Sequence, residues 1–110
     1  MSLRFLFDKR NPDGYNTIMI KSFTHKGLES FFFDGSRKKI HPKHAKKLAL
    51  ILDLLDAASV VSDMNFPGSG LHLLEPRQNG VWAVKVSGNW RVTFYFEACN
   101  AYDVNYVDYH

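Results

Sequence analysis

The stretch that decides the fold is Val81–Val107, which reads VWAVKVSGNWRVTFYFEACNAYDVNYV. Apolar and polar residues alternate along it, and two short clusters, Ser87–Asn89 and Ala98–Asn100, interrupt the alternation. A period of two residues is typical of half-buried β-strands, and interruptions of about three residues are typical of hairpin loops. The stretch therefore predicts three antiparallel strands, over residues 81–86, 90–97 and 101–107.

The first loop also predicts the register of its hairpin. If Ser87–Asn89 is a three-residue loop, Val86 lies opposite Trp90 and Lys85 lies opposite Arg91, so the apolar faces of both strands agree. A two-residue loop would place Ser87 opposite Trp90 and break this agreement. The odd loop length is therefore favoured.

The same argument for the second loop pairs Phe96 with Tyr102 and Tyr95 with Asp103. One face of the sheet is then predicted to be apolar and to form the core: Trp82, Val84, Val86, Trp90, Val92, Phe94, Phe96, Tyr102, Val104 and Tyr106. The other face, left uncovered, is polar, partly basic and aromatic: Lys85, Arg91, Thr93, Tyr95 and Asn105.

Two helices are predicted before this sheet. The first spans residues 25–33, with Thr24 as N-cap and Gly35 as its stop. The second begins at Pro42 and ends at Ala57 or Ala58. Its apolar residues recur at helical spacing and form one buried stripe: Ala45, Leu48, Leu52 and Leu55, widened by Ile51, Leu54 and Ala58. Short strands are also expected at Ile20–Phe23 and Leu71–Leu74.

Together these elements predict an α+β fold, in which an antiparallel or mixed β-sheet of 4–5 strands has two N-terminal α-helices packed on one face. The domain is expected to span residues 19–110. Residues 1–18 contain the charged turn cluster Asp8–Gly14 without apolar periodicity, and we expect them to be an N-terminal extension, natural or appended.

Composition limits the classes of protein that remain. The chain has 110 residues, enough for one domain with a core of its own, and a formal net charge of +3. Its single cysteine, Cys99, cannot form an intramolecular disulfide and fits a reducing compartment, so the cytoplasm is expected. No apolar run approaches the roughly 18 residues of a membrane helix. The histidines show no metal-ligand spacing, so no metal or other cofactor is expected.

Basic residues gather before and in the second helix. No acidic residue lies between Asp34 and Asp53, whereas Lys43, Lys46 and Lys47 occupy the first helical turns. Lysines near a helix N-terminus oppose its dipole, which indicates that local stability did not select them. A phosphate-rich partner explains them, and an ordinary solvated helix face is the alternative.

The chain ends in Asp108, Tyr109 and His110. A histidine beside a carboxylate can move a proton at neutral pH, although a terminal histidine is also common as a solvated tail residue. The sequence has no Gly-rich phosphate loop, no nucleophile elbow and no readable Cys/His pair.

Residues 19–110 resemble the HigB-type toxins of the RelE superfamily. The resemblance rests on Gly88–Phe94 (GNWRVTF) and the terminal Asp108–His110 (DYH), with further matches at residues 19–23, 44–48, 52–58, 63–65, 67–68 and 102–104. It implies a RelE-like fold, cleavage of mRNA held in the ribosomal decoding site next to ribosomal RNA, and neutralisation by a helix-turn-helix antitoxin of the HigA kind.

The resemblance also implies roles for residues. Metal-independent RNA cleavage uses the 2′-hydroxyl as nucleophile, so a site needs a base, a cation for the phosphoryl oxygens and an acid for the departing 5′-oxygen. Arg91 would hold the phosphate, Asp108 and His110 would share the proton transfers in either order, and Tyr109 would stack on or orient a base. The expected RNA-binding residues are Lys43, Lys46, Lys47, Arg77, Lys85 and Tyr95.

One position departs from the family pattern. Glu75 stands where the family commonly has a basic residue, with Arg77 two positions later. This departure keeps open an alternative, a toxin-fold protein that binds a target without cleaving it, as gyrase-inhibiting relatives do. A further alternative is a degenerate toxin that acts only as the partner of its antitoxin.

Overall fold

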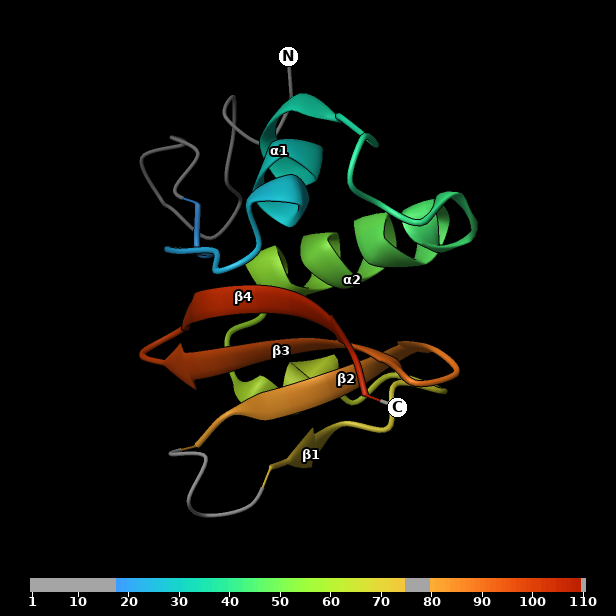
Figure 1. The fold of residues 1–110 in the computed structure, drawn as a ribbon. Helices are drawn as coiled ribbons and strands as arrows, with labels where there is room; N and C mark the ends of the chain where they lie inside the picture. Colours follow the sequence, from blue (N-terminus) through green and yellow to red (C-terminus); the bar gives the residue numbers. More distant parts are fainter. Residues whose placement is uncertain (1–17, 75–79, 110) are drawn as a thin grey trace.

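The computed structural model describes residues 18–74 and 80–109, and within them it contains two α-helices and a four-stranded sheet (Figure 1). The helices are α1 (Lys26–Asp34) and α2 (Ala45–Ala57). The strands are β1 (His72–Leu73), β2 (Trp82–Ser87), β3 (Trp90–Glu97) and β4 (Asn100–Asp108). The predicted order of the two helices and the last four strands is confirmed. The predicted strand at residues 71–74 is shorter than expected, and the one predicted at residues 20–23 forms only isolated bridges.

The sheet has the order β1-β2-β3-β4, and each neighbouring pair is antiparallel. The segment that precedes α1 runs along the outer edge of β4, where Ile20 and Phe23 form isolated parallel bridges with Ala101 and Val104. Both helices lie on the same side of the sheet in Figure 1. The predicted α+β class, with an antiparallel sheet of four strands and two helices on one face, is therefore confirmed.

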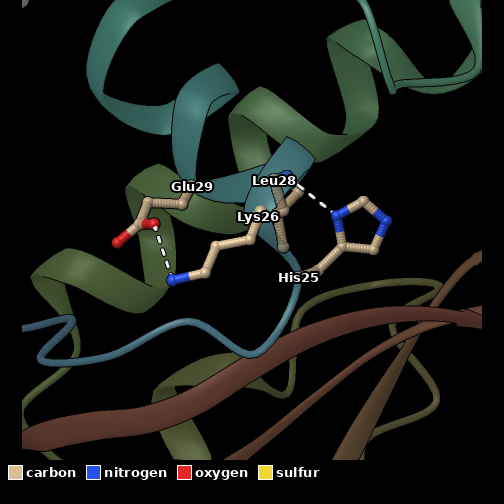
Figure 2. Close-up of polar contacts among 4 residues, drawn as sticks. All are labelled: His25, Lys26, Leu28 and Glu29. Atoms are coloured by element: carbon tan, nitrogen blue, oxygen red, sulfur yellow. Dashed lines mark hydrogen bonds and ion pairs between the residues drawn. The ribbon is translucent and has the colours of Figure 1, made fainter.

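Helix α1 begins one residue later than predicted because its N-cap is His25, not Thr24. The Nδ1 atom of His25 accepts a hydrogen bond from the backbone N–H of Leu28 at 2.9 Å, as Figure 2 shows. This bond satisfies one of the free donors of the first helical turn. Gly35 ends the helix as predicted, with a φ of 75° that favours glycine.

Helix α2 supplies most of the helical part of the core. Pro42 opens a short 3-10 turn, Pro42–His44, and the α-helix proper follows it. The residues of the predicted stripe are buried: Ala45, Leu48, Ile51, Leu52 and Leu55. They pack in one cluster with the buried strand residues Val84, Val92, Phe94 and Val104. The apolar periodicity of the sequence therefore identified the correct face of the helix.

Asp56, in the last turn of α2, has a tertiary role. Its carboxylate, although only 9% exposed, accepts hydrogen bonds from the backbone N–H groups of Met19 at 2.8 Å and Ile20 at 3.4 Å. These bonds attach the segment that runs along β4 to the end of α2. An acid at a helix C-terminus is unfavourable for the dipole, and here it is compensated by donors that lie 36 and 37 residues away.

The first hairpin differs from the prediction at its turn. Lys85 lies opposite Arg91 as predicted, but Ser87, not Val86, lies opposite Trp90. The register shifts between Lys85 and Ser87, so Val86 is the extra residue of a β-bulge and the loop has only two residues. The bulge restores the agreement of apolar faces that a two-residue loop would otherwise break, and Val86 remains buried.

The second hairpin also differs from the prediction at its turn. Glu97 pairs with Asn100, so the turn consists of Ala98 and Cys99, with φ values of 49° and 66°. Tyr95 therefore lies opposite Tyr102, not Asp103. A bulge at Asp103, whose φ is 52°, returns the strand to the predicted offset. Tyr102 was wrongly predicted on the core face, because this bulge places it beside Tyr95 on the uncovered face.

Candidate functional site

Arg91 lies in the middle of a short cross-strand row on the uncovered face. Lys85 of β2 is opposite it on one side and Val107 of β4 on the other. One terminal nitrogen of the guanidinium donates to the backbone carbonyls of Gly88, at 2.7 Å, and Trp90, at 3.0 Å. A guanidinium has five N–H donors, so several remain for a ligand while these two bonds fix its position over the β2–β3 turn.

Tyr109 lies on the same face as Arg91. Its backbone N–H donates to the carbonyl of Asn89 at 2.9 Å, which extends the β3–β4 pairing by one residue beyond β4. Residues alternate between faces along a strand, so Tyr109 follows Val107 onto the face of Arg91, diagonally across from it. Its side chain is 48% exposed and is therefore accessible to a partner.

Asp108 belongs to the other face. It lies opposite Trp90, the first residue of β3, whereas Arg91 lies opposite Val107. Alternation therefore places the Asp108 carboxylate on the Trp90 side and the Arg91 guanidinium on the Lys85 side, around the same turn. Arg91 and Asp108, for which the resemblance implies a common site, therefore lie on opposite faces at the end of the sheet. His110 and Arg77, which were also predicted in the site, lie outside the described residues.

The remaining predicted RNA-binding residues fall in two places. Tyr95 is on the uncovered face, but it lies four residues from Arg91 along β3, about 13 Å away at the usual rise of a strand. It faces Tyr102 and lines an open groove of about 630 Å³ together with Trp82, Glu97 and Asp103. Tyr95 and Arg91 are therefore parts of two separate areas of this face.

The predicted lysines of the helical layer lie on the opposite side of the sheet from Lys85. Lys43 and Lys46 are exposed, and the Nζ atom of Lys47 lies 5.5 Å from the centre of the Phe66 ring. In Figure 1 the chain around residues 37–44, the β2–β3 turn and the end of β4 nevertheless occupy one end of the molecule. Basic side chains therefore flank this end from both layers.

A buried cluster of rings behind the turn was missed by the sequence interpretation. The rings of Trp90 and Tyr106 are 4.6 Å apart, and His44 packs edge-on against both, at 5.5 and 5.9 Å. The Nδ1 atom of His44 lies 2.6 Å from the Tyr106 hydroxyl oxygen. The two residues are 62 positions apart in the chain, so no local pattern could have indicated their contact.

Burial sets the protonation of this cluster. Desolvation lowers the pKa of His44, and the charge of His41 lowers it further. Desolvation also raises the pKa of the Tyr106 hydroxyl, against a hydrogen bond with the backbone of His41, and the charge of Asp108 adds to the rise. Both groups are therefore neutral at pH 7, and the effect of Asp108 agrees with its position on this face.

His72 is a second residue whose position the sequence did not reveal. It lies on β1 opposite Ala83, in the row next to Lys85 and Arg91, so it shares the uncovered face. It is exposed, and its Nδ1 atom lies 3.0 Å from the carbonyl oxygen of Gly70. The spacing of the histidines along the chain bears on metal ligation and gives no information about a position in a sheet.

Within residues 18–74 and 80–109, no group of three or more His, Cys, Asp or Glu side chains is arranged to hold a metal ion. In the same residues, no helix has both the length and the apolar character that crossing a membrane requires.

Comparison with known proteins gives the family. The HigB-like toxin family, described as the RelE-like toxin of the type II toxin-antitoxin system HigB, matches residues 21–110. Endoribonuclease HigB of Proteus vulgaris is 37% identical over 92 residues, which are 84% of this chain and 100% of that relative. The match contains the Arg91 row, the β2–β3 turn and the end of β4. The chain therefore belongs to the HigB-like toxin family of type II toxin-antitoxin systems.

Proposed function

We propose that this protein is an endoribonuclease that cleaves mRNA and thereby inhibits translation. The observation that carries the proposal is the arrangement around the β2–β3 turn, where the Arg91 guanidinium is held by two backbone carbonyls beside Lys85 and diagonal to the exposed Tyr109. Cationic side chains bind the phosphates of an RNA, and an exposed aromatic ring stacks on one of its bases. The relative from Proteus vulgaris, named as an endoribonuclease, supports the same activity.

In the proposed reaction the 2′-hydroxyl of the RNA attacks the adjacent phosphorus, and the bond from phosphorus to the 5′-oxygen breaks. The products are a 2′,3′-cyclic phosphate and a new 5′-hydroxyl end. The attacking hydroxyl gives its proton to a base, and the leaving oxygen receives one from an acid; proton exchange with water then returns both groups to their starting states. Asp108 and His110 are proposed for these two transfers, in either order.

Arg91 would stabilise the charge that develops on the non-bridging oxygens. Tyr109 would stack on or orient the base next to the cleaved bond. Because Asp108 lies on the Trp90 side of the turn, the RNA would pass over the end of the sheet rather than along one face. Lys85 on one side and Lys43, Lys46 and Lys47 on the other would neutralise flanking phosphates, with Arg77 and Tyr95 as further contacts.

Membership of a type II toxin-antitoxin family implies an antitoxin partner. We propose that this antitoxin is a helix-turn-helix protein of the HigA kind. The substrate would be mRNA in the ribosomal decoding site, with ribosomal RNA beside it, so the protein would act in the cytoplasm.

The test is to map RNA ends in cells that express the protein. The wild type is expected to create new 5′-hydroxyl ends within coding sequences and to arrest growth. Arg91→Ala should reduce cleavage by about 10²–10³-fold, the usual effect of removing one donor to a transition-state oxyanion. Removal of Tyr109 and His110 should abolish it. Lys21→Ala, at an exposed position away from the turn, is the matched control and should cleave normally.

Growth arrest without new 5′-hydroxyl ends would refute the nuclease and indicate the alternative, a toxin-fold protein that binds its target without cleavage. Glu75, in place of the basic residue common in the family, is the feature of the sequence that favours this alternative. Expression without any growth defect would indicate a chain that serves only as the partner of its antitoxin.

A further inference from the structure

A basic cavity lies in the helical layer, apart from the Arg91 row. It has a volume of about 200 Å³ and is lined by the first turns of α1 and by the loop that follows this helix. Its lining consists of three lysines, two serines and a glycine: Lys26, Lys38, Lys39, Ser30, Ser36 and Gly27. Among the described residues no carboxylate lines it, so the cavity offers only cationic and hydrogen-bonding groups.

Gly27 is required for the shape of this cavity. A Cβ atom added at Gly27 would overlap the Cβ atom of Lys39 and would lie only 2.9 Å from the ring of His25. The absence of a side chain thus allows the loop to approach the first turn of α1. The turn Arg37–Ile40, closed by a hydrogen bond of 3.2 Å between backbone groups, holds Lys38 and Lys39 at the mouth of the cavity.

The charge at the cavity is only partly compensated. Lys26 forms an exposed ion pair of 3.8 Å with Glu29, and Figure 2 shows Lys26 and His25 extending to opposite sides of the first turn. The positive charge of Lys39 acts on the neighbouring imidazole of His25. Burial is the main cause that lowers the pKa of His25, a backbone hydrogen bond opposes the shift, and Lys39 adds to it. The beginning of α1 adds the positive end of a helix dipole.

Ring contacts connect this cavity with the end of the sheet. The ring of His25, the residue before Lys26, is 5.5 Å from the ring of Tyr106. Tyr106 is 4.6 Å from Trp90, which lies opposite Asp108. The cavity is therefore on the Asp108 side of the β2–β3 turn, and an RNA strand of several nucleotides that leaves the proposed cleavage position on this side passes close to it.

We propose that this cavity binds a backbone phosphate of the RNA substrate, outside the bond that is cleaved. The inference rests on the proposed function for the identity of the ligand, but not for the existence of the phosphate site. Lys38 and Lys39 supply the charge, Ser30 and Ser36 supply hydroxyl donors, and Gly27 keeps the cavity open. The site contributes affinity and positions the strand, and it takes no part in the chemical step.

The experiment measures binding separately from cleavage. The probe is a single-stranded RNA of about a dozen nucleotides with 2′-O-methyl groups, which lacks the attacking hydroxyl, and inorganic phosphate is the second probe. Lys38→Gln and Lys39→Gln are each expected to weaken RNA binding about threefold to tenfold at low salt. Each should also reduce the slope of log K against log [salt] by about 0.7, the value for one phosphate of a single strand.

Arg37→Gln is the matched control, because Arg37 is exposed in the same loop but does not line the cavity. It removes the same charge and should change RNA binding by less than either lysine substitution. An equal loss in the control would overturn the proposal, because the lysines would then act only through net charge.

Two further readouts distinguish the source of the phosphate. In amide NMR spectra of the full chain, both probes should shift Gly27, Ser30 and Ser36. Shifts with inorganic phosphate, combined with unchanged RNA affinity in both lysine variants, would overturn the assignment to RNA and indicate a small phosphate compound. No shift with either probe would overturn the site itself.

The proposal and the proposed function can fail separately. Lysine variants that bind RNA as the wild type does, in a chain that still creates 5′-hydroxyl ends, would contradict only the phosphate site. Loss of RNA affinity in these variants, in a chain that creates no such ends, would contradict only the nuclease.

Discussion

The Nδ1 atom of His44 and the hydroxyl oxygen of Tyr106 are 2.6 Å apart and buried. This hydrogen bond joins the turn before α2 to β4, two residues before Asp108. It is the polar centre of a ring cluster, in which His25 packs against Tyr106 and His41 packs against His44 and Trp90. The end of the sheet that carries the candidate site is therefore fixed to the helical layer by a specific polar contact as well as by apolar packing.

We predict that Tyr106→Phe destabilises the fold by about 1–3 kcal/mol, because it leaves the buried Nδ1 atom of His44 without its partner. Urea denaturation should show a lower midpoint with an unchanged slope. Tyr102→Phe removes the same hydroxyl from a partly exposed tyrosine on the uncovered face and should change the stability by less than about 0.5 kcal/mol. Equal effects of the two substitutions would contradict the role of the bond.

Stability is predicted to fall as the pH falls below about 6.5. Burial lowers the folded-state pKa values of His44 and His25 below 6.5, so the unfolded chain binds more protons between the lowered pKa and this value. The contribution is complete above 6.5, is lost as the pH falls towards the folded-state pKa, and then remains constant. Urea midpoints between pH 5 and 7.5 measure it. His44→Asn should flatten the profile, and a profile of unchanged steepness would exclude His44 as a cause.

Asp56→Ala is predicted to release the segment that precedes α1. The substitution removes the acceptor of the Met19 and Ile20 N–H groups and should cost about 1–3 kcal/mol. Amide hydrogen exchange should accelerate at Met19 and Ile20 more than at Val92 in the centre of the sheet. Asp34→Ala, at the exposed C-terminal end of α1, is the comparison for removing a carboxylate from the end of a helix. Uniform acceleration over the whole chain would show that Asp56 stabilises the fold without holding this segment.

We predict that substitutions in the turn between β3 and β4 increase the stability of the fold. Ala98 and Cys99 adopt φ values of 49° and 66°, which are unfavourable for both residues and favourable for asparagine and glycine. The double substitution Ala98→Asn, Cys99→Gly should therefore stabilise the fold by about 1 kcal/mol, seen as a higher urea midpoint. In contrast, Gly88→Ala introduces a side chain at a φ of 54° and should destabilise. A double variant no more stable than the wild type would mean that this backbone geometry carries no strain.

The pattern of the sequence was sufficient to predict the elements and the buried stripe of α2, because both depend on periodicity. It was not sufficient for the turns. The loops were predicted to have three residues because only an odd loop kept the apolar faces in agreement. In the structure each hairpin has a two-residue turn, and a bulge at Val86 or Asp103 restores the agreement. An extra residue within a strand leaves the apolar pattern of the sequence almost unchanged, so it cannot be located from that pattern.

The candidate site, like the fold, was only partly predictable from the sequence. The motifs around Arg91 and at Asp108–Tyr109 could be recognised from the sequence. The cross-strand neighbour Lys85 and the uncovered face of Arg91 followed from the predicted register of the first hairpin. Three features could not be recognised: the position of Asp108 on the face opposite to Arg91, the burial of His44 against Tyr106, and the close approach of the loop to Gly27 at the basic cavity. Each depends on residues that are distant in the chain or on the approach of two backbones.

The order of residues by itself determined the class of fold, the layer of helices and the family, because alternation, helical periodicity and short motifs are local properties of a chain. Only the tertiary structure decided which side chains share a surface. A bulge of one residue moves a tyrosine to the other face of a sheet, and a missing Cβ atom admits a loop, and neither effect is visible until the strands and helices are packed.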